Sequence, residues 1–202
     1  MQRLSTTVLG LVGSPTPARL RELATSMGEG ANVRAVLPEP QDTPLDRSVA
    51  AWREAAGAHL PYVVHDADPL AEVAAAWIDR WDGAGWDETR WGGMGDHGRL
   101  EVTVQAVLQR WRARSLDLPD YYLVVAADQL PETARHWYLG VLADAASHRV
   151  VVVEDDDAEV VAAVRGLRAG RWWPDLDRLL TELDRWAPDR FVAGSQPPPG
   201  LV

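Results

Sequence analysis

The chain contains no lysine, and all 20 of its basic residues are arginine. Isoleucine, asparagine and phenylalanine occur once each, as Ile78, Asn32 and Phe191. These four amino acids use AT-rich codons, so the composition indicates a bacterial genome of high GC content. Without lysine, the protein can supply neither the lysine that forms a Schiff base with pyridoxal phosphate nor the Walker A lysine of a standard P-loop NTPase.

Cysteine is also absent. Its absence excludes disulfides, thiolate nucleophiles, iron–sulfur clusters and cysteine-based zinc sites. The sequence also has no apolar run of 18 residues, and its first residues lack the apolar core of a signal peptide. We therefore expect a soluble, cytoplasmic protein that does not enter a membrane.

The chain has 20 basic and 30 acidic residues, for a formal net charge of −10. This balance argues against general binding to nucleic acids or anionic membranes, because both draw affinity from arginine and lysine. The length of 202 residues is typical of one domain. We expect a single α/β domain over residues 1–192 and a disordered, proline-rich tail over residues 193–202.

Short apolar, β-branched runs alternate with segments in which apolar residues recur at helical spacing. The runs that predict strands are 6–12, 33–37, 60–64, 121–127 and 150–153. Alternating strands and helices indicate parallel β-α-β units with right-handed crossovers. The sequence therefore predicts a three-layer α/β sandwich with a mostly parallel five-stranded sheet, Rossmann-like or flavodoxin-like in strand order.

Residues 83–98 break this alternation. The segment contains six glycines and no apolar period, so we expect a long loop. Its Trp86, Trp91 and Met94 are costly to leave in water. They are expected to pack on the domain itself, to close over a ligand or to dock on a partner, and they are the candidate residues for binding a protein partner or a second copy of the chain.

Acidic residues follow three of the predicted strands, at the edge where parallel sheets bind ligands. They are Asp66 and Asp68 after the third strand, Asp128 after the fourth, and Glu154 and Asp155 after the fifth. Converging carboxylates would bind Mg²⁺, which prefers oxygen ligands and is the one candidate cofactor. Helix capping explains the same acids, with Asp68 as N-cap and Pro69 as the first helical residue, and leaves Asp66 the least accounted for.

The turn after the first predicted strand could present backbone N–H groups and hydroxyls to an anion at a helix N-terminus. Its candidate residues are Gly13, Ser14 and Thr16. The turn lacks both the dinucleotide and the P-loop glycine patterns, and its two prolines each remove a backbone donor. With Asp66 and Asp128, these three residues complete the set of candidate ligand-binding positions.

These features leave three functions open. The first hypothesis is a non-catalytic α/β module that binds a partner or a ligand. The second is a Mg²⁺-dependent phosphoryl-transfer or hydrolytic enzyme with its site among the acidic residues, and the third is a nucleotide sensor at the Gly13 turn. No catalytic residue is assigned, because the five histidines have no metal-binding spacing and no GxSxG nucleophile motif occurs.

Overall fold

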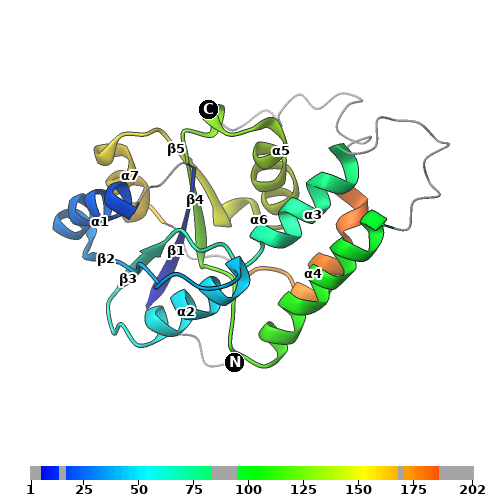
Figure 1. Cartoon of the computed structure of the whole chain (residues 1–202). Coiled ribbons are helices and arrows are strands. Elements are labelled where there is room, and N and C mark those ends of the chain that lie inside the picture. The colour runs from blue at the N-terminus through cyan, green and yellow to red at the C-terminus, as the bar shows by residue number, and fades with distance from the viewer. Residues whose placement is uncertain (1–5, 14–16, 83–94, 168–170, 187–202) are drawn as a thin grey trace.

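The computed structural model describes residues 6–13, 17–82, 95–167 and 171–186 (Figure 1). Five parallel strands form one sheet in the order β2-β3-β1-β4-β5. The strands are β1 (Thr7–Val12), β2 (Val33–Ala35), β3 (Tyr62–His65), β4 (Tyr121–Val125) and β5 (Val150–Val153). The predicted three-layer α/β sandwich is confirmed.

The strand order differs from both orders that the sequence favours. Rossmann sheets run 3-2-1-4-5 and flavodoxin sheets run 2-1-3-4-5, whereas here β3 lies between β2 and β1. Thr7 of β1 pairs in parallel register with Tyr62 of β3, and Val33 of β2 pairs with the same tyrosine. Strand length fits this arrangement, since the six-residue β1 is central and the three-residue β2 lies at an edge.

Helices cover both faces of the sheet (Figure 1). On one face, α1 packs beside α7, and apolar residues of both helices share a core cluster with residues of the sheet. Residues of α2, α3, α4, α6 and α8 contribute to the clusters on the opposite face. The helical segments are α1 (Pro17–Ala31), α2 (Pro44–Ala56), α3 (Ala71–Asp82), α4 (Gly95–Arg112), α5 (Glu132–Arg135), α6 (Ala143–Ala146), α7 (Asp157–Arg165) and α8 (Leu176–Thr181).

Side chains along the central strand alternate between the two faces. Leu9 and Leu11 of β1 lie in the cluster with α1 and α7, whereas Val8 and Val12 lie in the clusters of the opposite face. All four side chains are buried. Both faces are therefore apolar and covered, as expected for a parallel sheet whose strands read as continuous apolar runs.

Two helices begin or wind differently from the sequence prediction. α4 begins at Gly95, so the last four residues of the predicted 83–98 loop are helical. A glycine costs only about 1 kcal/mol within a helix, which the long helix that follows can offset. Residues His136–Leu142, between α5 and α6, form a π-helical segment (η3) inside the predicted helix. No helix in the described ranges is both long enough and apolar enough to span a membrane.

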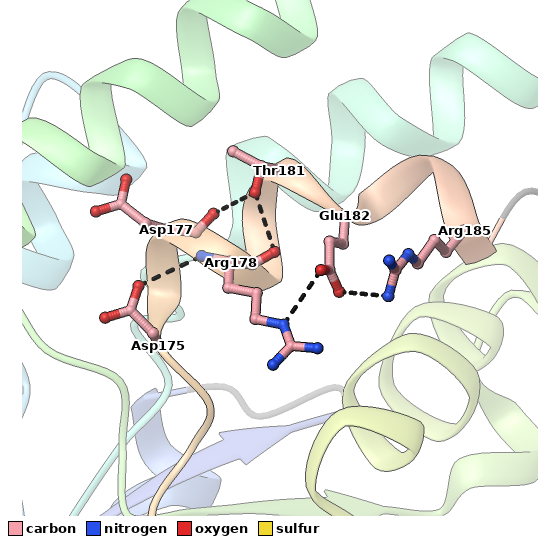
Figure 2. A network of polar contacts seen from close by, with 6 residues as sticks. All are labelled: Asp175, Asp177, Arg178, Thr181, Glu182 and Arg185. Carbon is pink, nitrogen blue, oxygen red and sulfur yellow. Dashed lines mark hydrogen bonds and ion pairs between the residues drawn. The ribbon is translucent and has the colours of Figure 1, made fainter.

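A polar network surrounds α8 near the end of the described chain (Figure 2). The Asp175 side chain caps the helix, and Glu182 accepts hydrogen bonds from Arg178 and Arg185. Exposed pairs of this kind contribute little to stability. The helix is held mainly by its buried leucines, which pack in the same cluster as α3 and α4: Leu176, Leu179 and Leu180.

Candidate ligand site at the carboxyl edge of the sheet

The carboxyl end of β1 is the point at which the chain connections diverge. The connection after β1 passes through α1 on one face of the sheet, whereas β3 and β4, its two neighbours, lead into α3 and α5 on the other face. Helices that leave adjacent strands toward opposite faces open a crevice between them, where parallel sheets bind ligands. Gly13, the residue after β1, lies at this point.

A cavity of about 480 Å³ opens between the ends of β1 and β3 and the start of α2. We call it the β1–β3 pocket. It is lined by Leu11, Val12, Gly13, Gln41, Asp42, Thr43, Pro44, Arg47, Asp66, Ala67, Asp68, Ala71 and Tyr138. Its volume falls in the range of roughly 300 to 1,000 Å³ that small-molecule sites occupy. A second cavity, on the α1 side of Gly13, measures only about 60 Å³ and has room for a few waters.

Asp68 is the best-connected polar group in the β1–β3 pocket. Its Oδ1 accepts hydrogen bonds from the Tyr122 hydroxyl at 2.8 Å and from the Leu70 N–H at 2.9 Å. Its Oδ2 accepts one from the Tyr138 hydroxyl at 2.7 Å. α3 begins at Ala71, and Asp68 caps the turn that leads into it, since its Oδ1 accepts the Leu70 N–H and its carbonyl oxygen accepts the Ala71 N–H at 3.2 Å. The carboxyl group also joins β3, β4 and the π-helical segment at the wall of the pocket.

Burial raises the pKa of Asp68 above its usual value, and its three hydrogen bonds offset part of that rise. Burial, together with the charge on Asp68, raises the pKa of Tyr122 and of Tyr138 well above the usual value of a tyrosine. Both hydroxyls therefore keep their protons at neutral pH and act as donors. Groups with shifted pKa values in a cleft often mark a functional site.

The opposite wall of the pocket carries an ion pair. Arg47, one turn into α2, donates to Oδ1 of Asp66 through its guanidinium. Next to it, Thr43 caps α2, since its hydroxyl oxygen accepts a hydrogen bond from the Asp46 N–H at 3.0 Å. Both polar features of this wall are thus already engaged with protein groups.

Replacing Tyr138 with phenylalanine tests the contacts around Asp68. The substitution removes one donor and leaves a partly buried carboxyl oxygen without that partner, so we expect the free energy of unfolding to fall by about 1 to 2 kcal/mol. The pKa of Asp68 should rise further, because the lost hydrogen bond favoured the charged form. Denaturant unfolding and NMR titration of the carboxyl measure both effects. Tyr62→Phe on β3 is the control, and an equal loss there would contradict the assignment.

The remaining acidic candidates do not converge on this pocket. Asp128 is exposed in the turn Ala127–Gln129, and Glu154 is exposed just after β5. Asp155 pairs with Arg19 of α1 at 2.9 Å and borders the smaller cavity. Asp157 completes this link between α1 and α7, since it accepts from Ser26 at 2.7 Å, the main cause of its lowered pKa.

Asp66 and Asp68 are therefore the only members of the predicted acidic set that share the β1–β3 pocket. In the described part of the chain, no group of three or more histidine, aspartate or glutamate side chains is arranged to hold a metal ion. The Mg²⁺ site stays a prediction. Ser14 and Thr16, and the partner-binding candidates Trp86, Trp91 and Met94, lie outside the described residues.

Sequence reasoning misses several polar residues of the site, among them Thr43, Arg47 and Tyr138. Arg47 lies in a helix that is predicted without reference to the site, Thr43 directly precedes that helix, and Tyr138 fits the apolar spacing of its own helix. A capping motif, Thr43 followed by a proline, is the available signal for the start of α2. No local pattern shows that this helix start lies beside Asp66, because that depends on the strand order.

The chain matches no protein-family model, no curated protein and no solved structure. The residues of the site are therefore assigned from their own contacts.

Proposed function

We propose that the protein is a binding module that takes up a small molecule in the β1–β3 pocket. The observation that carries this proposal is the position of a cavity of about 480 Å³ at the divergence point of the sheet. Sites of this kind combine apolar walls with a few convergent polar groups. Leu11, Val12 and Ala71 supply the apolar wall. The polar groups come from the residues after β3, from α2 and the residues just before it, and from Tyr138 of η3.

Binding accounts for the polar groups better than catalysis does. Both oxygens of Asp68 accept hydrogen bonds from neighbouring protein groups, and Arg47 is engaged with Asp66. Hydrogen bonds of this kind hold the groups in fixed positions, and a binding site requires such fixed positions. The Mg²⁺-dependent enzyme remains the second candidate, since Asp66 and Asp68 share one pocket, and binding to a protein partner through Trp86 and Trp91 stays a prediction.

Filling the pocket tests the proposal. Ala71 is half-buried at the first turn of α3 and lines the cavity, so Ala71→Phe places a ring where the ligand would sit. We expect the variant to stay folded and to lose at least about tenfold in affinity, or about 1.4 kcal/mol, for any fragment that binds the wild-type protein. Ligand-observed NMR with a fragment library containing neutral, cationic and anionic compounds measures this.

The matched control is Glu101→Phe, which places the same ring at an exposed position of α4 away from the pocket. Its fragment binding should equal that of the wild-type protein. Thermal unfolding of both variants checks that each is folded. Fragments that bind Ala71→Phe and wild-type protein equally would show that the β1–β3 pocket is not the ligand site.

A further inference from the structure

The β1–β3 pocket has more acidic than basic side chains. Three carboxyl groups line it, those of Asp42, Asp66 and Asp68, against the single guanidinium of Arg47. On the basis of the proposed function, we infer that the ligand is a small organic cation, an amine or a guanidine. The net charge of the whole chain, −10, also attracts cations.

The two features of the pocket that would attract an anion are already neutralised. Arg47 pairs with Asp66, whose side chain is only 12 % exposed. The N-terminus of α2 is capped by Thr43, begins with Pro44, which has no N–H, and carries Asp46 in its first turn. Because a carboxylate in the first turn meets the positive end of the helix dipole, a phosphate or carboxylate ligand would gain little there.

Asp68 and Tyr138 supply the chemistry that a cation requires. A carboxylate has about four lone-pair directions, and Asp68 uses three of them, so one is left for an ammonium or guanidinium N–H. Tyr138 lines the pocket beside this carboxylate, and tyrosine rings attract cations at their faces. A positive charge next to Asp68 would also offset the cost of burying its negative charge.

The size of the cavity favours an organic cation over a metal ion. A volume of about 480 Å³ greatly exceeds that of a bare ion, and no three histidine, aspartate or glutamate side chains of the described residues are arranged to hold a metal ion. The apolar Leu11, Val12 and Ala71 would face the carbon skeleton of such a ligand. A primary amine on a small aromatic or aliphatic skeleton meets these conditions.

Three near-isosteric probes, benzylammonium, benzyl alcohol and benzoate, test the inference by NMR titration of the full-length chain. We expect benzylammonium to bind at least about tenfold more tightly than the other two. Arg47→Gln should strengthen the binding of benzylammonium about fivefold, because a positive charge is removed and Asp66 loses its partner. Asp66→Asn should weaken the binding of benzylammonium by a similar factor. Arg53→Gln, at an exposed position of the same helix, removes the same charge away from the pocket and should change little.

The opposite results separate this inference from the proposed function. Tighter binding of benzoate or inorganic phosphate, together with weaker binding in Arg47→Gln, would identify an anion site and overturn the inference while leaving the pocket a ligand site. Displacement of benzylammonium by stoichiometric Mg²⁺ would overturn it in favour of the metal. If none of the three probes binds, but neutral fragments bind the wild-type protein and not Ala71→Phe, the inference of a cationic ligand fails and the proposed function stands. If no fragment of any class binds, the proposed function fails with it.

Discussion

Gly13→Ala is expected to destabilise the protein by about 3 kcal/mol. Gly13 has a φ of +136°, a backbone conformation that residues with a side chain rarely adopt. A Cβ atom there would lie 2.9 Å from the carbonyl oxygen of Val125 in the neighbouring β4. Because that oxygen belongs to the backbone of a central strand, relief requires β1 and β4 to shift. Urea unfolding monitored by tryptophan fluorescence measures the loss.

Gly98→Ala is the matched control for this prediction. Gly98 lies in α4, and a Cβ atom added there would have no neighbour within 4 Å, so alanine meets open space. The substitution should raise the free energy of unfolding by about 0.5 to 1 kcal/mol, because glycine is a poor helix former. If Gly13→Ala and Gly98→Ala changed the free energy of unfolding by the same amount and in the same direction, backbone strain at position 13 would be contradicted. Gly13 also borders the β1–β3 pocket, so its variant should bind fragments more weakly.

Acid should destabilise the protein through His65. This histidine ends β3, is 4 % exposed, and its Nδ1 has no hydrogen-bond partner among the described residues. Burial lowers its pKa from 6.5 to about 4, with Asp66 opposing and Arg47 adding to that shift. The folded state therefore holds the ring neutral, while the unfolded chain takes up a proton as the pH falls below about 6.5. The resulting loss is about 2 kcal/mol at pH 5 and about 3 kcal/mol at pH 4.

His65→Leu isolates this contribution, because other groups also titrate in acid. At pH 7 the variant should have nearly the stability of the wild-type protein, since it removes no hydrogen bond of Nδ1. Between pH 7 and pH 4 the wild-type protein should lose about 3 kcal/mol more than the variant does. Chemical unfolding at a series of pH values gives the difference. Parallel curves for the two proteins would show that His65 does not titrate as a buried group.

The elements of the fold are predictable because each has a strong local signal. β5 is four consecutive valines, and α2 begins at Pro44, directly after its cap Thr43, with apolar residues at helical spacing. The strand order is not predictable, because the pairing of β1 with β3 depends on contacts between residues more than 50 positions apart. The start of α4 at Gly95 is not predictable either. Gly95 and Gly98 are poor helix formers, so the local pattern indicates a loop, whereas the later residues of α4 stabilise the helix.

The candidate site shows the same division. The sequence singles out Asp66 as a candidate because helix capping does not explain it, and Asp66 lines the pocket. The local pattern assigns Asp68 to a cap, whereas its contacts with Tyr122 and Tyr138 come from residues 54 and 70 positions away. Arg47 reaches Asp66 only because α2 lies over the end of β3. Local patterns identify which groups are unusual, whereas the partners of those groups follow from the topology.

The most direct test of the central claim is amide chemical-shift mapping on the ¹⁵N-labelled full-length chain during titration with a fragment that binds it. A ligand in the β1–β3 pocket predicts saturable shifts that are largest at Gly13, residues 41–47 and residues 66–71, and that are lost in Ala71→Phe. Saturable shifts confined to another part of the molecule, such as α8 and the adjoining end of α4, would contradict the account.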